Sequence, residues 1–311
     1  MGSVLESLPR GGRAGIIRLR SLGDCVLTTP ALDLLKRARP DLRLAVMVED
    51  RFRDIFEGNP DVEEILPARL AALRRWRPAL CVNFHGGPRS AWMTALSGAR
   101  YRAGFGHFRY PFAYNVGIPR AQEILGVERK VHTAEHLASA MFYLGVPVGE
   151  IPRAKLVAQE GRWTHEDRGY PGPPHCCVIH PVAATAEKTW RADGFVAIAE
   201  HLKRCGLEPV FIGATGDDLA PFGAFRTIAG APLSEIKELL AGAALFVGND
   251  SGPAHMAAAF GVPSVVIFGP SDPAIWGPWR TSSEVVHSPD GLGRVEIAQV
   301  LDALTRLKVA A

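Results

Sequence analysis

The sequence predicts an α/β protein made of two doubly wound parallel-sheet domains that face a cleft. Short apolar runs rich in β-branched residues recur along the whole chain, and segments with helical spacing of apolar residues separate them. The same alternation appears in both halves of the chain. Continuous apolar strands joined by helices are typical of parallel sheets that are covered on both faces, and ligands bind such sheets at the carboxyl ends of their strands.

The first half contains three apolar runs that we expect to form strands: Ala14–Arg20, Leu42–Glu49 and Ala79–Gly86. A helix is expected to begin with Thr29 as its N-cap and Pro30 in its first turn, because apolar residues follow at helical spacing. Asp24 then falls in the loop between the first strand and this helix. Gly23 supplies the tight turn of that loop.

The second half repeats the pattern with four expected strands: "HCCVIHP", "EPVFIGA", "ALFVGND" and "SVVIFGP". Helices are expected at Asp193–Arg204 and Leu233–Ala241, and a last helix near Val295–Lys308 could pack on either domain. The stretch Glu160–His175 is polar and rich in Pro and Gly, which is typical of a linker. We therefore expect an N-terminal domain at 1–160 and a C-terminal domain at 161–311.

Composition and charge exclude several classes of protein. The 311 residues are 47% apolar and 22% charged, as in soluble globular proteins, and the net charge of +3 is too small to indicate nucleic-acid binding. The five cysteines form no CxxC pair, which favours reduced thiols over a metal site. No apolar run reaches the ~18 residues of a membrane span, and the N-terminus lacks the apolar core of a secretory signal. We expect a cytoplasmic protein, and association with an anionic membrane surface stays open.

The segment "NDSGPAH" after the apolar run "ALFVG" predicts a strand-to-helix turn that binds phosphate. The free N–H groups and the positive end of a helix attract anions, and Gly252 lets a ligand approach the backbone. His255 could donate to a phosphate or a sugar hydroxyl. An equally good interpretation is that Asp250 and Ser251 only cap the helix while His255 packs in the core.

Lys188 and Asp24 are two further candidate site residues, because each follows the end of an expected strand. Lys188 follows a loop of small residues, where its charge could neutralise a phosphate, although a single lysine is more often a solvated surface group. Asp24 follows the first strand, where a carboxylate near an acceptor hydroxyl could act as a general base. On local grounds alone, Asp24 could simply favour the positive end of its helix.

Taken together, these segments resemble glycosyltransferase family 9, the ADP-heptose:lipopolysaccharide heptosyltransferases. The matching segments run in order over most of the chain: "LGDCVLTTPAL", "NFHGGPRSA", "HTAEHLASAMFYLGV", "HPVAATAEKTW", "FIGATGDD" and the long block Arg226–Pro273. The last block is the most specific. The chain departs from the family at Val182, Ala184 and Arg191, where Gly, Ser and Pro are usual.

The resemblance implies a GT-B fold of two Rossmann-like domains, with the acceptor on the N-terminal domain and the nucleotide sugar on the C-terminal domain. It implies inverting transfer of heptose from ADP-heptose to an anionic glycolipid of the lipopolysaccharide inner core. It implies no metal and no cofactor, in agreement with the lack of an Asp-x-Asp motif. The residues that match the family's site are Asp24 as the base, and Thr185, Lys188, Asp217, Asp250, Ser251, Gly252 and His255 on the donor.

On the acceptor side we expect Arg89 and Arg102 to bind the anionic groups of the glycolipid, with Arg100, His107 and Arg109 nearby. A solvated face of mixed charge is an equally good interpretation of these residues. Peripheral association with the inner face of the cytoplasmic membrane also stays open. We expect no nucleic-acid partner.

Three other functions remain open at this point. The chain could use another nucleotide sugar, or it could be a nucleotide-sugar epimerase of the same fold. An epimerase needs several carboxylates around the sugar, and Asp24 and Asp250 are the only strong candidates. A non-catalytic nucleotide-sugar binding module is the third alternative, since fold alone does not decide function. The sequence identifies neither the donor sugar nor the acceptor position.

Overall fold

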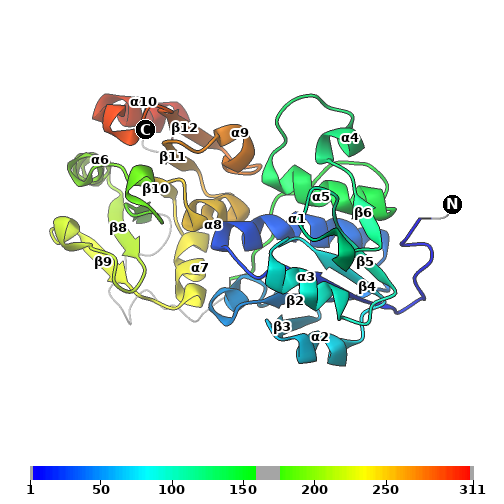
Figure 1. The fold of residues 1–311 in the computed structure, drawn as a ribbon. Helices are drawn as coiled ribbons and strands as arrows, with labels where there is room; N and C mark the ends of the chain where they lie inside the picture. Colours follow the sequence, from blue (N-terminus) through cyan, green and yellow to red (C-terminus); the bar gives the residue numbers. More distant parts are fainter. Residues whose placement is uncertain (1–2, 159–175, 309–311) are drawn as a thin grey trace. The chain divides into compact units, whose positions relative to one another are not determined.

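The computed structural model describes residues 3–158 and 176–308, and the chain divides into two compact units, Met1–Val157 and Ala158–Ala311. Figure 1 shows both units as ribbons with their elements labelled. The expected linker, Glu160–His175, lies outside the described residues. Each unit is built around its own parallel sheet.

The first unit contains a six-stranded parallel sheet in the order β3-β2-β1-β4-β5-β6. Its strands are β1 (Arg13–Ile17), β2 (Arg43–Val48), β3 (Glu64–Pro67), β4 (Leu80–Asn83), β5 (Tyr101–Phe105) and β6 (Val116–Ile118). This is the strand order of a doubly wound dinucleotide-type fold, in which the direction of winding reverses between β1 and β4.

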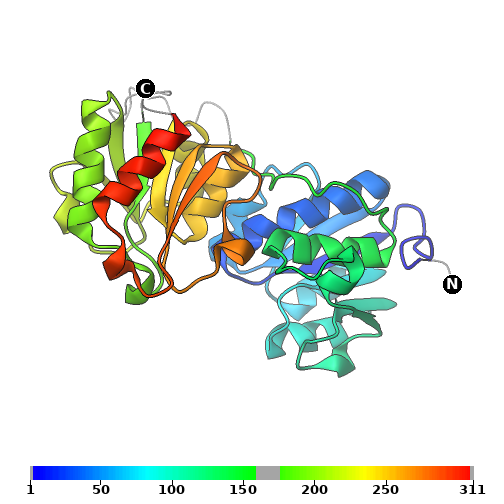
Figure 2. The ribbon, with the colours of Figure 1, turned by 90° about the horizontal axis from the view of Figure 1, so that it is seen from above.

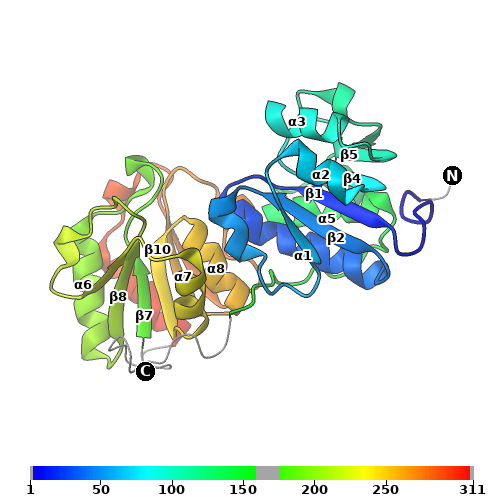
Figure 3. The same ribbon diagram turned by 90° about the horizontal axis from the view of Figure 1, so that it is seen from below.

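Helices cover both faces of the first sheet. Its elements are α1 (Leu22–Ala38), α2 (Leu70–Trp76), α3 (Pro88–Ala95), α4 (Ala121–Leu125), α5 (Thr133–Leu144), and the 3₁₀ helices η1 (Asp50–Ile55) and η2 (Pro111–Ala113). Helix α1 packs along α5, and Figure 3 shows α2 and α3 on the face opposite α1. Right-handed crossovers produce this division, because the chain moves across the sheet in opposite directions before and after β3.

The second unit repeats the same topology in a six-stranded sheet of order β12-β11-β10-β7-β8-β9, again all parallel. Its strands are β7 (Cys176–His180), β8 (Glu208–Gly213), β9 (Arg226–Ala229), β10 (Leu245–Asn249), β11 (Ser264–Phe268) and β12 (Ser283–His287). The predicted fold class, two doubly wound parallel-sheet domains, is therefore confirmed.

The helices of the second unit are α6 (Ala192–Arg204), α7 (Leu233–Ala241), α8 (Gly252–Phe260), α9 (Pro273–Trp276) and α10 (Ile297–Leu307), with the short 3₁₀ helices η3 (Ala186–Lys188), η4 (Ala220–Phe222) and η5 (Leu292–Arg294). Figure 2 shows α6 and α10 on one face of the sheet, and Figure 3 shows α7 and α8 on the other. The last helix, α10, packs on β11 and β12 and beside α6, so it belongs to this sheet.

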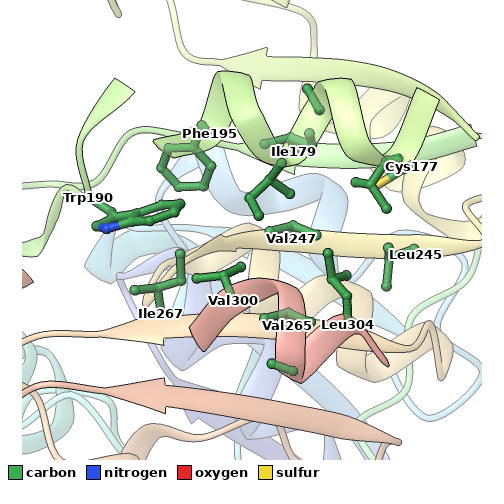
Figure 4. Packing of buried hydrophobic residues seen from close by; sticks show 14 of the residues in the cluster. Cys177, Ile179, Trp190, Phe195, Leu245, Val247, Val265, Ile267, Val300 and Leu304 are labelled. Atoms are coloured by element: carbon green, nitrogen blue, oxygen red, sulfur yellow. The ribbon is translucent and has the colours of Figure 1, made fainter. Parts of the chain in front are cut away.

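A buried apolar cluster joins the second sheet to α6 and α10. Alternate residues of β7, β10 and β11 point to this face, and Figure 4 shows them meeting Phe195 of α6 and Val300 of α10. Trp190 closes the cluster next to the loop after β7, where its indole Nε1 donates to the Val295 carbonyl at 3.0 Å. Packing thus fixes one end of a loop that carries predicted site residues.

The start of α1 was predicted wrongly. The helix begins at Leu22 rather than after Thr29, so Asp24 lies in its first turn and Pro30 lies in its interior. A proline there leaves the carbonyl four residues earlier without its usual N–H donor. The Thr29 hydroxyl donates to that carbonyl, the Val26 oxygen, at 2.8 Å. Local hydrogen bonding therefore allows the helix to continue through a residue that normally ends it.

Candidate active site

The predicted site residues cluster at the two points where the sheets reverse their winding. In the second unit Gly248 of β10 pairs with His180 of β7, and in the first unit Asn83 of β4 pairs with Ile17 of β1. The loops that follow neighbouring strands diverge at such a point and leave a crevice for a ligand. Each unit therefore offers one binding edge.

The turn after β10 leaves the start of α8 open to a ligand. Ser251 is the N-cap residue, yet its side chain makes no capping hydrogen bond. Its hydroxyl instead lies 3.0 Å from Nδ1 of His180. Because the capping interpretation required that side chain, the first-turn N–H groups of α8 are better matched to an anion than to Ser251.

Lys188 lies beside this turn rather than on the open surface. Its Nζ is 3.0 Å from Oδ2 of Asp250, whose side chain is 9% exposed, while the lysine side chain is 33% exposed. The ammonium group has three donors, so it can keep this bond and still meet an incoming oxygen. The structure therefore brings Lys188, Asp250 and Ser251 together.

Asn249 holds the loop after β7 against β10. Its Oδ1 accepts from the Trp190 backbone N–H at 3.0 Å, and the residue is fully buried. Among the described residues its Nδ2 has no hydrogen-bond partner. We did not predict a role for Asn249, although a polar residue at the end of an apolar strand was a usable signal.

His180 is a second residue whose role the sequence did not reveal. Burial lowers the pKa of its imidazole to about 4, and the charge of Asp217 opposes this shift without cancelling it. The ring is therefore neutral at pH 7. A neutral imidazole can exchange one hydrogen bond with the Ser251 hydroxyl without placing a positive charge in the core.

The remaining donor-side residues lie around this turn with different exposures. Asp217 follows β8, and its Oδ2 accepts from the Ala214 N–H at 2.6 Å, which closes that turn. Thr185 is exposed in the loop before Lys188. His255 lies in the first turn of α8 and is only 5% exposed.

Asp24 occupies the corresponding edge of the first sheet. Its Oδ2 accepts from the N–H and the hydroxyl of Ser21, at 3.3 and 3.0 Å, and its Oδ1 is 3.4 Å from Nη1 of Arg18. The carboxylate is 23% exposed, so it remains accessible to a substrate. Three donors fix the orientation of the carboxylate.

Arg18 itself is an unusual group for a sheet edge. It is 6% exposed, and within the described residues its Nε has no hydrogen-bond partner. Burial lowers the pKa of the guanidinium, and the neighbouring Asp24 acts in the opposite direction. A buried cation beside an ionised carboxylate is typical of a functional site, because each charge depends on the other for solvation.

A cavity of about 670 Å³ lies beyond β5 and β6 in the first unit, with His107, Arg120 and His136 in its lining. Burial lowers the pKa of His136 to about 4, and the charges of His107 and Arg18 add to the effect. Glu123 also lines the cavity, so a carboxylate opposes the charge of Arg120 there. An acidic ligand bound beside these histidines would raise their pKa values.

The two predicted acceptor arginines occupy different places. Arg89 lies in the first turn of α3, directly after the carboxyl end of β4, and its Nη2 donates to the Ala68 carbonyl at 2.6 Å. Arg102 is the second residue of β5, and its guanidinium donates to the Ala99 and Ala113 carbonyls at 3.3 and 3.2 Å. The structure brings Arg89 to the binding edge and does not bring Arg102 there.

Two general properties of the described residues bear on the chemistry. No group of three His, Cys, Asp or Glu side chains among them could hold a metal ion. No helix in the described parts combines the length and apolarity that a membrane span needs.

Comparison with known proteins places these features in context. The family model described as glycosyltransferase family 9 (heptosyltransferase) matches residues 71–296. Lipopolysaccharide heptosyltransferase 3 of Escherichia coli K12 is 26% identical over 84% of this chain and 83% of that protein. A family 9 glycosyl transferase structure from Veillonella parvula is 21% identical, with a TM-score of 0.84 over 96% of this chain and 98% of that one.

The E. coli heptosyltransferase WaaC, solved with ADP, is 20% identical, with a TM-score of 0.76 over 95% of this chain and 99% of that one. The same enzyme was also solved with ADP-2-deoxy-2-fluoro heptose, and that structure is 18% identical with a TM-score of 0.71 over 94% and 99% of the two chains. At these identities the structural likeness shows the fold.

The neutral His180 predicts a loss of stability in mild acid. Between pH 6.5 and pH 4 the imidazole binds a proton in the unfolded chain but not in the folded one. The free energy of unfolding is therefore unaffected by this group above pH 6.5 and decreases as the pH is lowered below 6.5. At pH 5 we expect a loss of about 2 kcal/mol relative to pH 7 from this group. Urea unfolding at both pH values should show a smaller loss in His180→Gln than in the unmodified chain.

The matched control is His287→Gln, which changes an exposed histidine of the same unit and should keep the full pH dependence. If His180→Gln also kept the full dependence, the buried neutral imidazole would not be the source.

Proposed function

Because the chain belongs to glycosyltransferase family 9 and is a glycosyltransferase, we propose that it transfers heptose from ADP-heptose to a hydroxyl group of a lipopolysaccharide inner-core acceptor. The predicted resemblance to this family is confirmed. The observation that carries the proposal is the placement of Lys188 beside the open start of α8, at the winding reversal of the second sheet. The E. coli relatives named above supply the donor and the acceptor class.

The donor diphosphate would bind at the start of α8. The N–H groups of the first turn and the Lys188 ammonium supply positive charge there. Gly252 begins the helix without a side chain, so an oxygen can approach its backbone. Ser251 and Thr185 add hydroxyl groups. In the absence of ligand, Asp250 keeps Lys188 in place through the 3.0 Å ion pair.

The other donor groups would bind the two ends of the nucleotide sugar. Asp217 follows β8, beside β7 in the sheet, where its carboxylate can accept from hydroxyl groups of the nucleoside. We assign His255 to the sugar or the diphosphate. Because its side chain is buried, only a small part of the ring can contact a ligand bound at the turn. Asn249 positions the loop that carries Lys188 through its bond to Trp190.

Asp24 would act as the general base on the acceptor. The acceptor oxygen forms a bond to the anomeric carbon on the face opposite the diphosphate, and the bond from that carbon to the diphosphate oxygen breaks. Asp24 takes the hydroxyl proton, and ADP leaves with the bonding electrons. Attack on the opposite face inverts the anomeric configuration. The charge that develops on the leaving ADP is stabilised by Lys188 and the start of α8 in place of a divalent cation.

The acceptor would bind the first unit through its acidic groups. Arg120, His107 and His136 line the cavity together with Glu123, and Arg89 follows β4, the strand next to β5. Arg102 stays a prediction, although its two bonds to backbone carbonyls fit a structural role better. Carboxylates and phosphates of an inner-core glycolipid match this environment.

Asp24→Asn is expected to lower kcat about 10²–10⁴-fold and to leave the KM for ADP-heptose unchanged, because the amide keeps the shape but takes no proton. The measurement is ADP release in the presence of an inner-core lipopolysaccharide acceptor, with thermal unfolding to confirm that the loss of the Arg18 ion pair leaves the fold intact. Asp302→Asn changes an exposed carboxylate on α10 and should behave as the unmodified chain. Full turnover in Asp24→Asn would assign the base to another group.

Lys188→Met is expected to lower kcat/KM for ADP-heptose about 10²-fold, because it removes one positioned charge from the leaving diphosphate. The control is Lys203→Met, which removes an exposed lysine of α6 in the same unit. Addition of EDTA should leave the rate of the unmodified chain unchanged. Equal kcat/KM in Lys188→Met and the unmodified chain, or inhibition by EDTA, would contradict the proposed stabilisation of the diphosphate.

Formation of an epimerised nucleotide sugar without acceptor would favour the epimerase alternative.

A further inference from the structure

Large apolar side chains are exposed together on the outer surface of α3 and η2. Trp92 is 57% exposed, Leu96 44% and Phe112 55%. The ring centroids of Trp92 and Phe112 lie 5.0 Å apart, and Tyr110 extends the group at 6.3 Å from Phe112. These four residues are called the α3–η2 patch below.

The patch is not an incompletely buried part of the core. Leu96 is the C-cap of α3 and follows Trp92 by four residues, so the two side chains lie on one side of the helix. The residues between and beside them that face the sheet are buried, namely Ser90, Ala91, Met93 and Thr94. Helix α3 therefore has a buried inner face of mixed polarity and a separate apolar face toward solvent.

Charge is segregated around the same elements. From Ile65 to Gln122 the sequence contains no Asp, Glu or Lys, and it contains nine arginines. Eight of them are exposed: Arg69, Arg74, Arg75, Arg77, Arg89, Arg100, Arg109 and Arg120. Because the whole chain has a net charge of only +3, the rest of the chain is net acidic. The mild average charge thus conceals a strongly basic segment.

Most of these arginines form no ion pair with an acidic side chain in the described parts of the chain. Arg89 lies 3.8 Å from Glu49, whereas no described acidic side chain forms an ion pair with the other seven. Elsewhere in the first unit, Arg39, Arg43 and Arg129 each bind a carboxylate. Guanidinium groups that stay unpaired on one segment are available for an external anion.

The patch and the arginines of α2 and α3 lie on the same face of the first unit, whereas Arg120 precedes α4, which packs on α5. Helices α2 and α3 both lie opposite α1, and η2 packs against α3. The segment from His107 to Phe112 also connects the acceptor-side cavity to the patch, since His107 lines that cavity. Arg109 lies over the Tyr110 ring at 5.9 Å, so a cation adjoins the exposed aromatics.

We propose that the α3–η2 patch docks on a lipid bilayer whose headgroups are anionic. Trp, Tyr, Phe and Leu favour the boundary between headgroups and hydrocarbon, and the surrounding arginines bind lipid phosphates. A nucleic acid would bind the arginines but would leave Leu96 and Phe112 exposed. A protein partner would not require a segment as long as Ile65–Gln122 without Asp or Glu. Docking would bring the segment from His107 to Phe112 close to a lipid-anchored acceptor, and in that role the inference rests on the proposed function.

The test is co-sedimentation of the purified full-length chain with phosphatidylcholine vesicles and with vesicles containing 30% phosphatidylglycerol. We expect binding to the anionic vesicles, at least tenfold weaker binding to the neutral ones, and about tenfold weakening between 0.1 and 0.5 M NaCl. The double variant Trp92→Ala/Phe112→Ala should weaken binding about tenfold or more, since both rings leave the interface. Arg100→Ser/Arg109→Ser should weaken binding to the anionic vesicles alone.

Matched controls are Tyr143→Ala, an exposed aromatic of α5 on the opposite face, and Arg204→Ser, an exposed arginine of the second unit. Both should bind as the unmodified chain does. The proposal is overturned if the unmodified chain does not bind anionic vesicles, or if the patch variants bind them as strongly as the unmodified chain. It is also overturned if the patch variants lose binding to single-stranded RNA rather than to vesicles. ADP release with a delipidated core acceptor should be unchanged in Trp92→Ala/Phe112→Ala, so loss of docking and failure of the transfer proposal give different results.

Discussion

Parallel strand pairing is the constraint on which the rest of the structure depends. Because β7 and β10 run side by side in one direction, the residues that follow them emerge at one edge, with Gly248 opposite His180. A side chain at Gly248 would come within 2.9 Å of the His180 carbonyl, so the close pairing itself requires glycine there. The loop with Lys188 and the turn with Asp250 are therefore brought together by backbone geometry before any ligand binds.

Ion pairs stabilise the charged residues at the binding edge of each sheet when no substrate is bound. Lys188 is paired with Asp250, and the buried Arg18 with Asp24, so neither cation is left uncompensated. His180 and His136 stay neutral because burial lowers their pKa values. A diphosphate or an acidic acceptor can then exchange with an existing partner instead of entering a site of unopposed charge.

The sequence predicted the fold class and most long elements because apolar periodicity is strong in β1, β2, β7, β8, β10 and β11. It missed β3, β5, β6, β9 and β12, because each of these short strands has a Glu, Arg or Gly within its apolar residues. It placed the start of α1 at Thr29 because no propensity reports the hydroxyl bond to Val26. Asn249 and His180 were missed because their importance lies in partners distant along the chain. Arg102 was chosen for its charge, while its carbonyl contacts depend on tertiary structure.

The central claim is that the second unit binds an adenosine diphosphate sugar at the start of α8. The most direct measurement is the thermal unfolding of the purified chain with ADP, UDP, GDP and dTDP, because a ligand of the folded state raises the midpoint according to its concentration and affinity. The account predicts a selective rise with ADP and a further rise with ADP-heptose. A selective rise with UDP or dTDP would contradict the assigned donor, and no rise with any nucleotide would contradict the diphosphate site itself.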